Sequence, residues 1–287
     1  MKTGIVFPHH EIGTDPGAIR AFATGAESLG ADHLLIYDHV LGAERDRPGG
    51  FQGPYDKDVQ FHEPFTLLSY LAAVTSSIEL VTTVLILPQR QTALVAKQAA
   101  ELAILSENRF RMGVGTGWNA VEYEALNEDF NSRGRRQSEQ VELLRRFWRE
   151  DAFSFEGEFH KVTQAGINPR PSTPVPIWFG GGAPALLTRC ARLGDGWMPL
   201  MGPNDAAAAA LASLKEQREA AGLSWDGFGI QAQAQAGGGT PERWHSHFGK
   251  WQALGATHMA FATHNAGSDS VDEHLQSFEA YLEAVKG

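Results

Sequence analysis

Short apolar segments alternate with amphipathic segments along the whole chain. Apolar runs bounded by Gly, Pro or charged residues are typical of buried strands, and apolar residues at three- and four-residue spacing are typical of helices. The strands expected on this pattern are 3–7, 33–37, 78–87, 109–114, 176–179, 195–199, 228–234 and 257–263. The helices expected between them are 15–29, 63–74, 92–105, 139–148, 183–193, 206–221, 241–254 and 271–285.

This alternation predicts a parallel sheet, because parallel strands need a crossover connection. The repeats predict an α/β fold closed into a (β/α)8 TIM barrel, and no linker divides it, so residues 1–287 are expected to form a single domain. A small hairpin insertion is expected near 152–162, where apolar and polar residues alternate around a Glu–Gly turn. Active sites of such barrels lie at the C-terminal ends of the strands, so the residues that follow each strand are the first candidates.

Composition narrows the range of partners. The chain has 287 residues, of which 43% are hydrophobic, and a formal net charge of -10, which argues against nucleic acid or an anionic membrane as a partner. A single cysteine excludes an internal disulfide. No segment has a signal-peptide pattern or transmembrane length. We therefore expect a cytoplasmic protein that acts on a small molecule.

Three glycines stand between an apolar strand and a helix. The turn reads Gly180, Gly181, Gly182 and Ala183, with Pro184 next. The first N–H groups of a helix have no partner inside the helix, and glycine lets a ligand approach the backbone closely. The turn is therefore a candidate phosphate site. The alternative is a tight turn that needs positive φ and binds nothing.

Asp38 and His39 follow the second expected strand. A histidine at a barrel mouth can hydrogen-bond or exchange a proton with a reacting group near neutral pH, which makes His39 the candidate catalytic residue. A His–Asp pair that only stabilises the fold is the alternative. His9 and His10 are adjacent and so point to opposite faces of a strand, and the chain has no His-Glu-x-x-His helix, so no metal site is expected.

Gly115, Gly117 and Trp118 follow the fourth expected strand. The glycines would let a flat ring lie against the backbone, with Trp118 as a wall of its site; a core tryptophan is the alternative. Thr83 and Val84 lie near the end of the third strand, where functional barrels can carry bulges or strain.

Two polar stretches are candidates for ligand contacts. The loop 41–61 is rich in Gly, Pro and charged residues and is long for a compact domain, which predicts a mobile lid over the substrate. Arg133, Arg135 and Arg136 precede an acidic helix. We expect them to form ion pairs on a solvated face, with the binding of an anionic ligand tail as the alternative.

Several segments together resemble the bacterial luciferase-like superfamily, and more closely its coenzyme F420 (deazaflavin)-dependent oxidoreductases. The segments are AESLGAD at 26–32, DHV at 38–40, KQAAEL at 97–102, LSENRF at 105–110, GVGTGW at 113–118, RGR at 133–135, PIWFGG at 176–181 and GDGW at 194–197. Their order and spacing extend over the first six strands, whereas the last third of the chain matches mainly in layout.

The resemblance implies a barrel that holds a flavin or deazaflavin at its mouth. It places the cofactor phosphate at 180–183, His39 near the reacting face of the ring, and a bulge, often with a non-prolyl cis peptide, at Thr83–Val84. One position departs from the sugar-phosphate dehydrogenases of the deazaflavin branch. They carry a glutamate directly after the Gly-Thr-Gly turn, where this chain has Trp118, and Glu122 lies further along. The substrate is therefore left open.

The function implied by this resemblance is hydride transfer between an organic substrate and coenzyme F420. An FMN-dependent monooxygenase is the alternative within enzymes, and a flavin- or deazaflavin-binding protein without turnover is the alternative outside them. A homodimer is expected from the resemblance alone. The catalytic residue is expected to be His39, and the cofactor-binding residues Asp38, Thr83, Val84, Gly115, Gly117, Trp118, Gly180, Gly181, Gly182 and Ala183.

Overall fold

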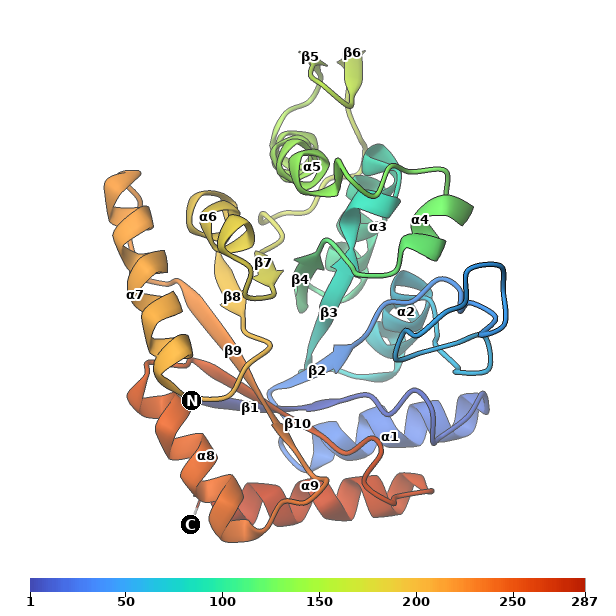
Figure 1. Cartoon of the computed structure of the whole chain (residues 1–287), viewed down its shortest axis with the longest axis vertical. Coiled ribbons are helices and arrows are strands. Elements are labelled where there is room, and N and C mark those ends of the chain that lie inside the picture. The colour runs from blue at the N-terminus through green and yellow to red at the C-terminus, as the bar shows by residue number, and fades with distance from the viewer. Residues whose placement is uncertain (287) are drawn as a thin grey trace.

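Eight parallel strands close into a barrel in this computed structural model, which describes residues 1–286. The order around the barrel is β1, β10, β9, β8, β7, β4, β3 and β2, and Figure 1 shows the strands surrounded by helices. The strands are β1 (Lys2–Val6), β2 (His33–Ile36), β3 (Glu79–Ile86), β4 (Phe110–Gly115), β7 (Ile177–Gly180), β8 (Gly196–Met198), β9 (Gly229–Gln235) and β10 (His258–Ala262). The predicted (β/α)8 barrel is confirmed.

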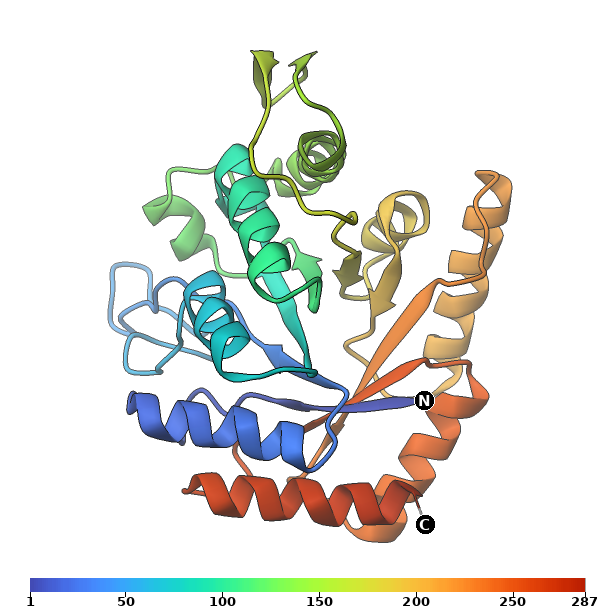
Figure 2. The same cartoon turned by 180° about the vertical axis from the view of Figure 1, so that it is seen from behind.

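The helices pack around the outside of this barrel, as Figure 2 shows from the opposite side. None of those described in residues 1–286 combines the length and the apolar character that a bilayer-spanning helix needs. They are α1 (Pro16–Ser28), α2 (Pro64–Val74), α3 (Thr92–Leu105), α4 (Ala120–Ala125), α5 (Arg133–Arg149), α6 (Pro184–Leu193), α7 (Asp205–Ala220), α8 (Pro241–Ala253) and α9 (Val271–Lys286), with a short 3-10 helix η1 (Leu87–Gln89).

Local signals in the sequence set where several helices begin. Asp15 caps α1 by accepting a hydrogen bond from the backbone N–H of Ala18 at 2.8 Å, and Pro16 occupies the first helical position. Glu63 caps α2 in the same way, accepting from the N–H of Thr66 at 2.8 Å. These caps orient each helix as the chain leaves the C-terminal end of a strand.

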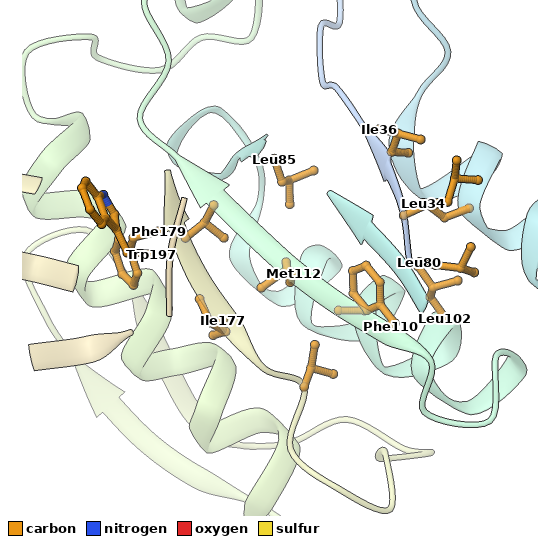
Figure 3. Close-up of a cluster of buried hydrophobic side chains, with 14 of the residues drawn as sticks. Leu34, Ile36, Leu80, Leu85, Leu102, Phe110, Met112, Ile177, Phe179 and Trp197 are labelled. Atoms are coloured by element: carbon orange, nitrogen blue, oxygen red, sulfur yellow. The ribbon is translucent and has the colours of Figure 1, made fainter. Parts of the chain in front are cut away.

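The nearly continuous apolar runs of the strands are explained by two separate apolar layers. Leu34 and Ile36 point outward into the core between strands and helices, and Figure 3 shows Leu80, Phe110 and Phe179 in the same layer. Residues of the opposite parity fill the barrel interior; this second cluster is Val6, Leu35, Val81, Trp178, Met198, Ala260 and Ala262. A strand covered on both faces needs apolar residues at every position.

The N-terminal end of the barrel, its floor, is closed by a polar cluster. Arg111 is 2% exposed and donates to Glu79 at 2.8 Å and to Gln231 at 3.1 Å. Its guanidinium lies 4.0 Å from the ring centre of Trp178. His33 packs in the same place and is fully buried. We refer to Arg111, Glu79, Gln231, His33 and the neighbouring His258 as the floor cluster.

Two expectations about the middle of the chain need correction. The hairpin consists of β5 (Phe153–Glu156) and β6 (Lys161–Ala165), so it ends later than 162 and its turn is four residues long. The carboxylate of Glu139 holds this turn by accepting from the N–H groups of Glu158 and Phe159. The helix α5 begins at Arg133 rather than at 139, because its first turn is polar and gives no apolar periodicity.

Candidate active site

The mouth of the barrel is shaped by an irregularity at the end of β3. The strand pairing with β4 shifts register between Thr82 and Leu85, and the peptide between Thr83 and Val84 is cis. A Cβ atom on either Gly115 or Gly180 would lie 2.4 Å from a methyl of Val84. The absence of side chains on these two glycines thus makes room for Val84.

Val84 also faces a small cavity at the centre of the mouth. This cavity measures about 40 Å³ and is lined by Thr83, Val84, Gly180 and Gln233, among others. Gly117 lies next to Ile86 with a φ of +66°, a conformation that favours glycine. The three glycines therefore support the bulge and the turn after β4. Whether they also contact a cofactor ring stays a prediction.

His39 is oriented by a carboxylate on α4. The Nδ1 atom of His39 lies 3.3 Å from Oε1 of Glu122, and the same oxygen accepts from the N–H of Val40 at 2.9 Å. Glu122 is 2% exposed. Because an ionised carboxylate can only accept, Nδ1 carries the proton and Nε2 is left free to exchange one.

Asp38 belongs to the scaffold behind this histidine. Its two carboxylate oxygens accept from the N–H of Ile86 at 2.8 Å and from Arg90 at 2.8 Å. Arg90 in turn donates to Glu63 at 3.0 Å. Burial raises the pKa of Asp38, and Arg90 opposes that shift. Asp38 thus ties the end of β2 to the end of β3, and a direct contact with the cofactor stays a prediction.

Aromatic side chains from the 41–61 loop pack over His39. The ring centres of Tyr55 and Phe61 lie 5.0 and 4.6 Å from that of His39, and the ring centre of Trp118 lies 5.7 Å away. Trp118 is 43% exposed and contacts Phe51 of the same loop, so it is not a core residue. A cavity of about 240 Å³ lies within the loop, lined by His39, Tyr55 and Phe61 among others. In Figure 1 the loop lies beside α2 and α4.

Three more histidines lie at the mouth near His39, after the neighbouring strands β1 and β10. His9 accepts from the N–H of Tyr37 at 3.1 Å, and burial lowers the pKa of His9 to about 3. His10 packs edge-on against Phe61, and His264 packs edge-on against Tyr37. Burial also lowers the pKa of both His10 and His264, so these three histidines are uncharged near neutral pH. In residues 1–286, no group of three or more His, Cys, Asp or Glu side chains is arranged to hold a metal.

The glycine turn before α6 presents free N–H groups. Gly181 has a φ of +125°, and its N–H donates to Met198 O at 3.0 Å. Ala183 is the N-cap of α6 and has no side chain to cap it. Within the described chain, the N–H groups of Gly182, Ala183 and Ala185 have no protein acceptor. An anion can therefore bind at this helix N-terminus.

Two arginines without carboxylate partners lie between α5 and α6. Arg133 stacks on Phe130 at 3.7 Å, and Arg189 donates to Gln137 at 3.3 Å. Burial lowers the pKa of Arg189, and the adjacent charge of Arg133 lowers it further. Neither forms an ion pair within residues 1–286. Two adjacent cations without counter-charges favour the binding of an anion.

The other two arginines expected in this segment form ion pairs with carboxylates. Arg135 pairs with Glu158 at 2.9 Å, and Arg136 pairs with Glu128 at 2.6 Å. The expected ion pairs on a solvated helix are therefore present for these two residues, whereas Arg133 has none and its contact with an anionic ligand stays a prediction.

The luciferase-like monooxygenase family model matches residues 1–279 of the chain. The chain belongs to this family. A luciferase-like relative, an uncharacterized protein of Mycobacterium tuberculosis, is 41% identical over 238 residues, which are 78% of this chain and 82% of that protein. The F420-dependent glucose-6-phosphate dehydrogenase of Kineococcus radiotolerans is 34% identical over 194 residues, 64% of this chain. The aligned part spans about half of that dehydrogenase, 52%.

The solved structure of an F420-dependent secondary alcohol dehydrogenase, in complex with an F420-acetone adduct, has the same luciferase-like fold. The TM-score is 0.80 with 17% sequence identity, and the likeness covers 100% of both chains. At this identity the likeness concerns the fold alone. The chain is an oxidoreductase of the luciferase-like family, as expected from its sequence.

Sequence reasoning on this luciferase-like chain missed two site residues. Glu122 follows His39 by 83 positions, and no local pattern indicates that their side chains meet. Arg189 lies on α6, far in sequence from Arg133, and only the packing of α5 against α6 brings them together. The one available signal was that Glu122 stands in an amphipathic helix just after the glycine turn.

Proposed function

We propose that this luciferase-like protein transfers hydride between a small organic substrate and coenzyme F420 held at the barrel mouth. The observation that carries the proposal is His39, whose Nε2 is free because Glu122 accepts from Nδ1. The names of the Kineococcus relative and of the alcohol dehydrogenase with the same fold support F420 as the cofactor.

The residues of the mouth fit such a cofactor. The unpartnered N–H groups of Gly182, Ala183 and Ala185 suit a phosphate, and Arg133 and Arg189 add positive charge beside them. Val84 and Trp118 also offer an apolar bulge and an exposed indole against which a flat ring could lie. When bound, the deazaflavin supplies a ring carbon that takes up or releases a hydride.

The chain's own residues would supply the proton transfer. His39 would take a proton at Nε2 from a substrate hydroxyl, or return it to a carbonyl oxygen, while Glu122 keeps the imidazole oriented and stabilises its charged form. The aromatic side chains Tyr55 and Phe61 would exclude water from the reacting groups.

FMN-dependent oxygenation is the second candidate, because the matching family model describes monooxygenases. Titrating the purified protein with F420 and with FMN, side by side, separates the two by cofactor fluorescence. We expect tighter binding of F420. Binding of FMN alone would favour the monooxygenase, and tight F420 binding without turnover on any substrate would favour a binding protein.

Gly181→Val tests the phosphate turn in the same titration. A Cβ there would lie 2.9 Å from Leu186 at a φ of +125°, so the turn must shift. We expect affinity for the cofactor to fall by about tenfold, the effect of one or two lost hydrogen bonds to a charged group, with an unchanged circular dichroism spectrum. Gly222→Val is the matched control, because Gly222 also has a positive φ, +71°, but lies at the end of α7 in open space. Equal affinity of wild type and Gly181→Val would remove the phosphate from this turn.

A further inference from the structure

We infer that the substrate is an uncharged alcohol or carbonyl compound with an aromatic or alicyclic body, and not a phosphorylated or carboxylated compound. This inference rests on the proposed function, because it concerns the substrate that meets His39. It is carried by three features of the mouth: its paired cations, its uncharged histidines and its aromatic lining.

The cations on the side of the mouth nearest the 41–61 loop already have carboxylate partners. Four basic residues border it: Arg45 pairs with Asp56, Arg47 with Glu124, Lys57 with Glu44 and Asp58, and Arg90 with Asp38 and Glu63. The 41–61 loop has four acidic and three basic residues. An anionic group near His39 would therefore find no free positive charge on this loop and would meet an excess of carboxylates.

The histidines that follow β1 and β10 cannot supply the missing charge. His9, His10 and His264 are neutral near pH 7, because burial lowers the pKa of each. The carboxylate of Glu11 lies among them, and its Oε2 is buried without a hydrogen-bond partner in the described chain. The Nε2 atom of His10 and the Nδ1 atom of His264 are likewise buried without a hydrogen-bond partner in the described chain.

Aromatic side chains pack around His39 and favour an apolar substrate body. Tyr55 and Phe61 pack edge-on or tilted against His39 and against each other, with 4.9 Å between their own ring centres. Trp118 adds a third aromatic surface. Aromatic and alicyclic groups pack well against flat rings of this kind. A charged group would lose its hydration among them.

For such a substrate, the hydride and the proton that leave the alcohol each have an acceptor. With the cofactor bound, an alcohol would give up the hydride on its carbinol carbon to it and its hydroxyl proton to Nε2 of His39, and the carbon–oxygen single bond would become a carbonyl. Reduction of a ketone or aldehyde runs the same exchange backwards. The imidazole then exchanges its proton with water.

Three probes with the same body test the inference: benzyl alcohol, benzoate and benzyl phosphate. Their binding to the F420-loaded protein is measured by isothermal titration at low salt, which needs no turnover. We expect benzyl alcohol to bind at least about tenfold more tightly than either anion, because unpaired charge is penalised in the mouth. Equal or tighter binding of benzoate or benzyl phosphate overturns the inference, and so does failure of all three to bind the loaded protein. Failure to load F420 at all would instead count against the proposed function.

A charge-neutralising double variant sharpens the test. Glu44→Gln with Asp58→Asn removes both partners of Lys57, which lines the cavity within the loop. We expect benzyl phosphate to bind about threefold more tightly or better, the size of one exposed ion pair, with benzyl alcohol unchanged. Asp46→Asn is the control, because it removes an acid from the same loop without freeing Lys57. If both variants leave benzyl phosphate binding unchanged, paired cations are not what excludes anions and the inference fails.

Discussion

The barrel carries buried ionisable side chains at both of its ends, and the two groups serve different purposes. The floor cluster is closed, because Trp178 covers Arg111 and His33 is fully buried. At the mouth, His39 borders a cavity of about 240 Å³ and its side chain is 13% exposed. The floor groups contact one another, Trp178 and Thr257, whereas His39 at the mouth lines a cavity.

The difference teaches that burial and a shifted pKa do not by themselves locate an active site. Burial holds the pKa of His33 well below its usual value, and burial followed by the charge of Arg111 lowers that of His258 to about 3. Both lie at the floor, at the opposite end of the barrel from His39. Access, together with an oriented proton carrier such as His39 with Glu122, is what distinguishes the mouth.

The largest effect is expected at the mouth. His39→Gln should slow single-turnover hydride transfer by at least about tenfold, since proton-transfer help of this kind is worth about 10²–10⁴ in rate. The cofactor should still bind and the melting temperature should be unchanged. Stopped-flow absorbance of the bound cofactor is the measurement, once a substrate is found.

Glu122→Gln is the companion variant for His39→Gln. The amide oxygen can still accept from Val40 and from His39, so orientation is kept and the negative charge is lost. We expect a smaller loss of rate than for His39→Gln and a changed pH profile. Equal rates for wild type and His39→Gln would remove His39 from the mechanism.

The floor should respond in the opposite way. Arg111→Met leaves Glu79 and Gln231 without their partner, and removing one member of a buried pair costs about 3 kcal/mol in the free energy of unfolding. Turnover per folded molecule should be unchanged. Urea unfolding measures the loss of stability, and the rate assay on the same preparation measures turnover. A floor variant with normal stability and reduced turnover would contradict the division between the two ends.

The floor also predicts how stability depends on pH. The folded-state pKa of His258 is about 3, below the value near 6.5 of an unfolded chain, so the unfolded state binds more protons as the pH falls below 6.5. The stabilisation is complete above pH 6.5 and is lost progressively towards pH 3. When the pH falls from 7 to 5, each histidine that the folded state keeps neutral should lower the free energy of unfolding by about 2 kcal/mol. His258→Asn should flatten this dependence, and His245→Asn, at an exposed position on α8, should not.

The features of these two ends that the sequence could predict are those that depend on residues close together along the chain. The glycine turn at 180–183 and the cap at Asp15 are written in neighbouring residues, so their elements were predicted nearly in full. The contact between His39 and Glu122, and that between Arg111 and Gln231, join residues 83 and 120 positions apart. Such pairs depend on strand order and helix packing, which periodicity does not specify.

The smallest expected effect concerns the loop that gives the mouth its access. Residues 41–61 contain one isolated bridge, between Ala43 and Asp56, and otherwise no helix or strand. Arg45 and Lys57 are exposed sites for trypsin, and both lie in this loop. A segment with few ladder hydrogen bonds opens locally at little cost, so trypsin should cut here first in the free protein. The aromatic contacts of Tyr55 and Phe61 with His39 tie the loop to the site, and a ligand at the mouth should slow the cut severalfold without protecting the chain elsewhere. Mass spectrometry of the first fragments gives the position. Equal resistance with and without cofactor would make this loop a fixed wall, and the mouth would then differ from the floor in shape alone.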